Sequence, residues 1–270
     1  MTTPRTWLFV FAVLALVSRA VTAADELPLI LEETFSDGAE RWQPADKNGW
    51  KVETVDGKHL YRLVDRNEHE PPHRSPYNIS ILADVEVSDF ELTAHVRSTG
   101  RDYGHRDVCL LFGYQDPANY YYVHFGKKTD DHANQIFIVN DAPRVKISTK
   151  TTPGTPWDDE WHTLRVTRDV DSGAIAVYFD DMDEPVMTAT DKTFTSGRIG
   201  IGSFDDTADF ERITLRQYGR DRRRQGESLT TALSSNAVKQ PCQVTKRANV
   251  SRETFGAPAA IGSIVSRETP

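Results

Sequence analysis

Residues 169–215 read DVDSGAIAVYFDDMDEPVMTATDKTFTSGRIGIGSFDDTADFERITL. In this stretch, short runs of alternating apolar and polar side chains are separated by turns that contain aspartate or glycine. Alternation places successive side chains on opposite faces of an extended chain. The stretch has no sustained apolar repeat of about 3.6 residues, which would indicate an amphipathic helix. The pattern therefore predicts consecutive antiparallel β-strands.

The same pattern continues over most of the chain. Residues 50–55 and 59–64 alternate around Asp56-Gly57, a strong signal for a two-residue hairpin turn. Residues 65–76 are polar and proline-rich, as expected of a loop. Further strands are expected at 29–31, 90–97, 108–114, 120–125, 135–139, 145–147, 162–167, 175–179, 186–189, 199–204 and 210–215. Many short strands at close spacing predict an all-β sandwich or barrel.

Composition divides the chain into three parts. An apolar run inside residues 1–23 follows Arg5, ends at the small residues before Ala24, and is too short to span a bilayer, so it predicts a signal peptide. Residues 27–218 carry the strand pattern and are expected to form one domain. Residues 219–270 are rich in serine, threonine and charge, and we expect a disordered tail. The mature chain is expected to be secreted or periplasmic, with no transmembrane segment.

The charge balance excludes one class of partner. The chain has 32 basic and 40 acidic side chains, a net charge of −8. Loss of Arg5 and Arg19 with the leader leaves 30 basic against 40 acidic side chains, or −10. Nucleic-acid-binding domains usually carry a basic face. We therefore expect no nucleic-acid partner.

Cofactor motifs are absent from the sequence. Cys109 and Cys242 are the only cysteines, and there is no C-x-x-C or cysteine–histidine metal spacing. Cys109 lies in an apolar run and is expected to be a buried thiol, although a disulfide between the two is compatible with an exported protein. The acidic turns at 180–184 and 205–209 could hold calcium, but aspartate-rich hairpin turns explain them adequately. We predict no cofactor and no metal ligands.

Several segments resemble a known group of proteins. They are YYYVHFG (120–126), DHANQIFIV (131–139), DAPR (141–144), WHTLRV (161–166) and GIGSFDDT (200–207). The chain resembles secreted bacterial proteins of the concanavalin A-like lectin/glucanase superfamily, with the closest likeness to the 3-keto-disaccharide hydrolase type of domain. The resemblance covers about residues 31–215. It implies a two-sheet antiparallel jelly-roll sandwich that binds a carbohydrate on its concave face or rim.

The paired carboxylates of a laminarinase-like glycosidase are not present in the expected form. Glycoside hydrolysis usually needs two carboxyl groups across the scissile bond. The nearest match on one strand is Asp84 with Glu86, but the residue types are exchanged relative to that motif. Solvated carboxylates explain the pair better. A laminarinase-type reaction is therefore not expected.

One strand predicts a saccharide-binding face. In 120–125, alternation places Tyr122 and His124 on the same face, where an aromatic ring can stack on a sugar and an imidazole can hydrogen-bond to it. The candidate substrate-binding residues are Tyr122, His124, His132, Asn134, Arg144 and Trp157, the last expected at the rim. Tyrosine and histidine that simply line a half-exposed sheet are an equally good explanation of Tyr122 and His124.

The loop 100–107 supports an enzymatic alternative. His105 could act as an acid or base near neutral pH, with Asp107 or Asp102 orienting its ring, and the candidate catalytic residues are His105, Asp107 and His124. Three hypotheses remain open: a secreted carbohydrate-binding protein, a glycoside hydrolase of the 3-keto-disaccharide type, and a cell-surface interaction domain.

Overall fold

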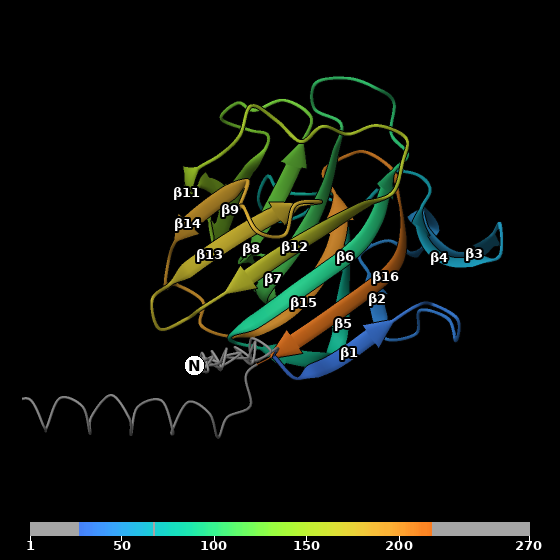
Figure 1. The fold of residues 1–270 in the computed structure, drawn as a ribbon, viewed down its shortest axis with the longest axis horizontal. Helices are drawn as coiled ribbons and strands as arrows, with labels where there is room; N and C mark the ends of the chain where they lie inside the picture. Colours follow the sequence, from blue (N-terminus) through green and yellow to red (C-terminus); the bar gives the residue numbers. More distant parts are fainter. Residues whose placement is uncertain (1–26, 67, 218–270) are drawn as a thin grey trace, which may run out of the picture. The chain divides into compact units, whose positions relative to one another are not determined.

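The computed structural model describes residues 27–66 and 68–217, and every regular element in these ranges is a β-strand except one short 3₁₀ helix. The strands form two antiparallel sheets that pack face to face (Figure 1). One sheet has nine strands, in the order β11-β14-β13-β12-β6-β16-β4-β3, with β1 also paired to β16. The other has seven, in the order β10-β9-β8-β7-β15-β5-β2. The prediction of an all-β, two-sheet antiparallel sandwich is confirmed.

The elements are β1 (Leu29–Glu33), β2 (Trp42–Pro44), η1 (Lys47–Gly49), β3 (Trp50–Val55), β4 (Lys58–Leu63), β5 (Asn78–Val87), β6 (Phe90–Ser98), β7 (Asp107–Asp116), β8 (Asn119–Gly126), β9 (Gln135–Asn140), β10 (Val145–Lys146), β11 (Ser148–Lys150), β12 (His162–Arg168), β13 (Ala174–Phe179), β14 (Met187–Thr190), β15 (Gly197–Ser203) and β16 (Ala208–Gln217). Each expected strand is present, and its ends differ from the prediction by two residues or fewer. No helix among the described residues is long and apolar enough to cross a membrane.

The hairpin between β3 and β4 follows directly from its turn residues. Val55 pairs with Lys58, so Asp56 and Gly57 form a two-residue loop. Their φ angles are 51° and 80°. Positive φ at both positions is the requirement of the hairpin turn whose twist matches the flanking strands, and aspartate followed by glycine meets it with little strain.

The main core lies between the two sheets and is built by alternation. From β8, Tyr121, Val123 and Phe125 point into this core. Tyr120 and Tyr122 belong to a separate apolar cluster on the other side of the seven-stranded sheet. The period-two assignment of this strand is therefore correct.

Three strands are missing from the expected set, β2, β5 and β11, although Asp84 and Glu86 of β5 were assigned to one strand. The long strand β5 has five buried residues in succession at its start, including the polar Asn78 and Ser80. Its apolar side chains change face along the strand, since Val85 and Val87 pack with the main core. Both of its faces are covered: Leu82 packs in the main core, whereas Ile79 and Ile81 pack on the outer side of the sheet.

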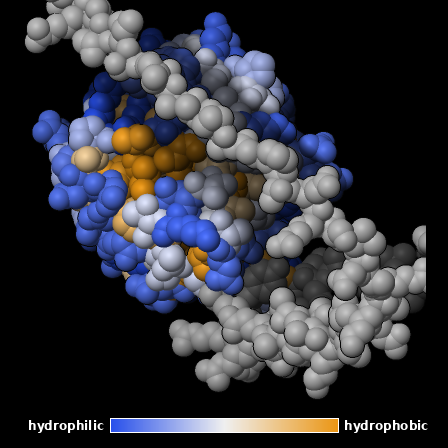
Figure 2. Space-filling model, turned by 90° about the vertical axis from the view of Figure 1, so that its left-hand side faces the viewer, coloured by the Kyte–Doolittle hydropathy of each residue, from blue (hydrophilic) through white to orange (hydrophobic). Residues whose placement is uncertain are grey.

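Figure 2 shows the side of the sandwich on which β11, β14 and β9 lie in Figure 1, with an apolar area among hydrophilic residues. At this end, Val145 of β10 is 58% exposed, and the partly buried Ile147 and Val186 pack against the main core.

The signal peptide expected at 1–23, the tail expected at 219–270 and Cys242 lie outside the described residues.

Candidate ligand-binding site

The outer face of the seven-stranded sheet, which points away from the other sheet, carries a second apolar cluster. We call it the outer-face cluster: Ile79, Ile81, Cys109, Leu111, Tyr114, Tyr120, Tyr122, Phe137 and Val139. All of them are buried. The segment 64–77, which leads from β4 to β5, helps to cover this face: its His69 lines a pocket together with Ile79 and Ile81. Tyr122 was expected on a half-exposed face, and this expectation is corrected, because its side chain is fully buried.

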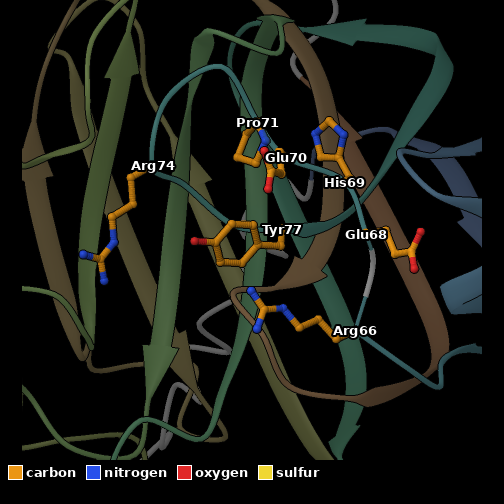
Figure 3. Close-up of a pocket in the computed structure, with 7 residues that line it drawn as sticks. All are labelled: Arg66, Glu68, His69, Glu70, Pro71, Arg74 and Tyr77. Carbon is orange, nitrogen blue, oxygen red and sulfur yellow. The ribbon is translucent and has the colours of Figure 1, made fainter.

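A layer of arginine and aromatic side chains lies over part of this face. We call it the arginine–aromatic cluster: Arg66, Arg74, Tyr77, Phe137, Arg144 and Phe204. The Tyr77 and Phe204 rings meet edge to face with centroids 5.1 Å apart. Arg66 lies over Tyr77 at 4.9 Å, and Arg74 lies over Phe204 at 5.9 Å. Figure 3 shows Tyr77 at the centre of this region with Arg66 and Arg74 around it. The cluster offers aromatic faces and N–H donors on one surface.

Arg144 connects the cluster to the sheet below it. Its guanidinium lies 4.7 Å from the Phe137 ring centre and 4.5 Å from that of Phe204. Its Nη1 donates a hydrogen bond of 2.7 Å to the Tyr122 hydroxyl, and Tyr122 stacks on Phe137 at 5.1 Å. The predicted residues Tyr122 and Arg144 are thus brought together. Tyr122 is buried beneath Arg144, so the arginine and not the tyrosine is accessible from outside.

The covering segment forms a pocket beside this cluster. The pocket has a volume of about 610 Å³ and is lined by Arg66, Glu68, His69, Glu70, Pro71, Arg74 and Tyr77 (Figure 3). A smaller pocket of about 180 Å³ adjoins it through His69 and reaches Tyr114 and Arg198. The larger volume falls in the range of about 300–1,000 Å³ that is typical of small-molecule sites. His69 Nε2 is buried and has no hydrogen-bond partner among the described residues.

Asp107 and His124, two of the predicted catalytic residues, lie close together but are buried. The His124 Nε2 atom is 3.8 Å from the Asp107 Oδ2 atom, and both residues are at most 3% exposed. Asp107 accepts hydrogen bonds from the Phe204 backbone N–H (2.8 Å) and from the Ser203 hydroxyl (3.1 Å). Asp107 therefore holds the end of β15 and the Phe204 ring in place, and its burial argues against direct contact with a substrate.

Burial determines the protonation of this pair. The pKa of His124 is lowered to about 3, first by burial and then by the positive charge of Arg144. The pKa of Asp107 is raised from 3.8 to about 8, first by burial and also by the neighbouring Asp206 carboxylate. Burial also raises the pKa of Asp206, which accepts a hydrogen bond from the backbone N–H of Asp107 (3.0 Å). His124 is neutral at neutral pH and is poorly suited to act as a charged acid.

These shifts predict how stability depends on pH. A raised folded-state pKa means that protonated Asp107 stabilises the fold, and this contribution is lost as the pH rises toward 8. The wild type should therefore lose stability relative to Asp107→Asn as the pH rises from about 6 to 8. We expect the difference between their free energies of unfolding to change by about 1–2 kcal/mol. Urea denaturation of both proteins across this range measures it. A difference that is constant or grows with pH contradicts the assignment.

Asp107, Asp205 and Asp206 form an acidic cluster whose carboxylate oxygens lie within 4.8 Å of one another. The sequence pattern predicts a turn at 205–209, and the fold brings Asp107 next to this turn. All three carboxylates have donors within the protein. The Tyr103 hydroxyl lies within hydrogen-bond distance of Asp206 (2.9 Å) and Asp205 (3.4 Å), and Asp107 accepts from the Phe204 backbone N–H. These hydrogen bonds join β7 to the loop after β15, and this structural role explains the cluster.

His105 and His132 share a partner at the rim. His105 is exposed, and its Nε2 lies 2.9 Å from Asp130 Oδ2. The other Asp130 oxygen accepts a hydrogen bond from the His132 backbone N–H (2.6 Å). The orienting carboxylate for His105 is therefore Asp130, whereas Asp102 pairs with Lys127. Of the predicted catalytic set, only His105 is accessible.

Asn134 and Trp157 were expected to contact a ligand, but both side chains are buried. Asn134 is buried with φ = 55°, and its Nδ2 donates to Thr129 (2.7 Å) and to the Thr152 carbonyl (3.1 Å). It shapes the turn before β9, and its backbone N–H donates to His124 Nδ1 (3.3 Å). Trp157 is 2% exposed in the main core, so its expected place at the rim is corrected.

Asp84 and Glu86 are exposed on β5, and Asp84 pairs with Arg41 at 3.1 Å. Both fit the expectation of solvated carboxylates.

Sequence reasoning missed Arg66, Arg74, Tyr77 and Phe204. The first three lie in or beside the loop expected at 65–76, and Phe204 follows β15. A usable signal was present, because a connection of about 12 residues or more without secondary structure is usually functional or disordered. The contacts between this loop and Phe204 depend on the tertiary fold.

A third pocket lies on the outer face of the nine-stranded sheet. It has a volume of about 690 Å³ and is lined by Thr34, Gly57, Lys58, His59, Thr93, His95, Thr163, Glu211, Arg212 and Thr214. Glu211 bonds to both Lys58 (2.8 Å) and His95 (2.6 Å), and Arg212 pairs with Glu32 (2.8 Å). The charges of this groove are satisfied within the protein, unlike those of the arginine–aromatic cluster.

Solved structures with a similar fold include a carbohydrate-binding module, a β-glucanase and a lectin. A carbohydrate-binding module, CBM66, from Bacillus subtilis is 17% identical, with a TM-score of 0.48 over 66% of this chain and 96% of the module. A β-glucanase from Bacillus licheniformis is 14% identical, with a TM-score of 0.45 over 69% and 97%. Lectin I-B4 from Griffonia simplicifolia, in a metal-free form, is 15% identical, with a TM-score of 0.40 over 68% and 98%. These likenesses assign no ligand or activity to this chain.

No protein-family model matches the chain, and no curated protein matches it at a significant level.

Proposed function

We propose that this protein binds a saccharide on the outer face of the seven-stranded sheet, at the arginine–aromatic cluster. The observation that carries the proposal is the partly exposed pair Tyr77 and Phe204, in edge-to-face contact beside a pocket of about 610 Å³. Aromatic rings pack on the C–H faces of sugar rings, and arginine N–H groups donate to hydroxyl oxygens. The pocket lining supplies several charged and polar groups for such contacts.

A second candidate function is glycoside hydrolysis, of the kind found in the 3-keto-disaccharide hydrolase type of domain. The observation that favours it is the exposed His105–Asp130 pair at 2.9 Å, a geometry suited to a general acid or base. The burial of Asp107 and His124 weighs against it. A third candidate, a cell-surface interaction domain, has no specific observation in its favour.

Binding of an extracellular or periplasmic glycan would agree with the signal peptide that the first 23 residues predict. We therefore place the proposed binding outside the cytoplasm.

Substitution of the two partly exposed rings tests the proposal. Screening on a glycan array should identify a ligand, and Tyr77→Ala and Phe204→Ala should each weaken its affinity about 10-fold or more, which corresponds to about 1.4 kcal/mol of lost contact. Isothermal titration calorimetry measures the affinity. The matched control is Trp161→Ala, because Trp161 is an aromatic residue in contact with Lys58, Arg97 and His95 beside the third pocket.

The control also separates the two faces of the protein. If Trp161→Ala abolishes binding while both other variants bind normally, the saccharide site is on the nine-stranded sheet and our proposal is wrong. If the ligand is also turned over and turnover is lost in His105→Ala, the second candidate function is correct.

A further inference from the structure

We propose that the saccharide bound at the arginine–aromatic cluster carries a negative charge, as a carboxylate or a sulfate group, and that Arg144 receives it. This inference rests on the proposed function, since it concerns the ligand of the same site. It follows from the surroundings of one partly buried arginine and from the charges near it.

Arg144 is a cation with no anionic partner in the part of the chain that the structure describes. Aromatic rings lie on it at 4.7 and 4.5 Å, and its one hydrogen bond among the described residues goes to a neutral phenol, that of Tyr122. No carboxylate in residues 27–66 or 68–217 lies within 4.0 Å of its guanidinium nitrogens. Partly buried arginines are usually paired with an anion, because removing a charge from water is costly unless it is compensated.

The geometry of Arg144 suits a planar, two-oxygen acceptor. The Phe137 and Phe204 rings pack on the guanidinium and Nη1 is used by Tyr122, whereas Nε and Nη2 have no acceptor among the described residues. These two nitrogens present parallel N–H groups along one edge. Carboxylate and sulfate oxygens accept such a pair in the bidentate arrangement that arginine favours.

Two further arginines increase the positive potential at this place. Arg66 and Arg74 belong to the same cluster, are exposed, and have no ion pair among the described residues. Glu68 and Glu70 line the adjoining pocket, but neither lies within 4.0 Å of these arginines. In a chain with a net charge of −8, three unpaired arginines around one ring system indicate a local site for an anion.

The charge of Arg144 also acts on a neighbouring histidine. The positive charge of Arg144 lowers the pKa of His124, after the larger effect of burial. An anionic ligand would reduce this influence of Arg144, so binding should raise the pKa of His124, which NMR titration of the imidazole can follow.

The test compares ligands that differ only in charge. An oligogalacturonide with free carboxylates is measured beside the same oligomer with its carboxylates methyl-esterified, and a sulfated galactan oligosaccharide beside its desulfated form. We expect one charged member to bind at least about 10-fold more tightly than its neutral counterpart at low salt, with the advantage reduced at high salt. The pair that shows the preference identifies the anion as carboxylate or sulfate.

Variants locate the charge recognition. Arg144→Gln should remove most of the preference for the charged ligand, and Arg144→Lys should restore part of it. The matched control is Arg165→Gln, because Arg165 is also an arginine stacked on an aromatic ring, 4.2 Å from that of Tyr178, and has the same charge. It should keep the full preference. The comparison of charged with neutral ligands on the wild-type protein remains decisive even if the Arg144 variants do not fold.

The outcomes separate this inference from the proposed function. Equal affinity for charged and neutral members of both pairs, with binding still lost in Tyr77→Ala, overturns the inference and leaves saccharide binding intact. A preference that survives in Arg144→Gln also overturns it. Absence of binding to every glycan tested overturns both proposals.

Discussion

Arg106→Ala is expected to lower the free energy of unfolding by about 3 kcal/mol, because it leaves buried carbonyl groups without a donor. The Arg106 side chain is 2% exposed. Its Nη2 donates to the carbonyls of Ser98 and Asp158, at 2.7 Å each, and its Nε donates to the Ser98 hydroxyl at 2.9 Å. One side chain thus joins the end of β6, the start of β7 and the segment before β12. The loss is a large fraction of the roughly 5–15 kcal/mol that stabilises a typical domain.

Chemical denaturation of the wild type and of two variants measures this effect. Arg106→Met keeps most of the aliphatic volume and should lose nearly as much stability as the alanine variant, since the hydrogen bonds are responsible. Arg41→Ala is the control, because the Arg41–Asp84 pair is exposed, with side chains 41% and 55% accessible. Its removal should cost at most about 1 kcal/mol. Equal losses in Arg106→Ala and Arg41→Ala would show that the buried network contributes little.

Trp157→Ala is expected to lower the free energy of unfolding by about 3–5 kcal/mol. The ring packs edge to face on Phe179 and His162, with centroids 5.3 and 5.5 Å away. Its Nε1 donates a hydrogen bond of 2.6 Å to the Phe125 carbonyl, which links the loop before β12 to the end of β8. The truncation opens a cavity between the sheets and leaves this carbonyl without its donor.

Trp157→Phe separates the two contributions, because it keeps an aromatic ring and removes only the N–H donor and part of the volume. It should lose less stability than the alanine variant, by thermal and chemical denaturation. Saccharide affinity measured well below the unfolding temperature should change little in Trp157→Phe. If Trp157→Phe folds stably but loses saccharide affinity, Trp157 acts at the ligand site as the sequence predicted.

Much of the fold could be predicted because it depends on local pattern. Asp56-Gly57 specifies a hairpin through its own backbone preferences, and alternation in β8 assigns each side chain to a face without knowledge of the partner strand. The unrecognised strand β5 marks the limit of this reasoning, because its first five residues are all buried although Asn78 and Ser80 among them are polar. Burial on the second face comes from segments that are distant in sequence.

The candidate site could be predicted only in part for the same reason. Tyr122 and Arg144 were both expected near a ligand, and they do meet, through a hydrogen bond of 2.7 Å. No local pattern could show that Tyr122 is buried beneath Arg144. Tyr77 and Phe204 are separated by more than a hundred residues, and only the return of β15 beside β5 brings their rings together.

The sequence by itself determined the all-β class, most of the strand positions, the β3–β4 hairpin turn and the face to which each β8 side chain points, because these depend on backbone preference and on a period of two. The tertiary structure alone decided which polar groups are exposed. It buried Asp107, His124 and Trp157 and left His105 at the rim with Asp130. It also placed three arginines around the Tyr77 and Phe204 rings. Accessibility and unbalanced charge are properties of the assembled sheets and loops, and no local pattern encodes them.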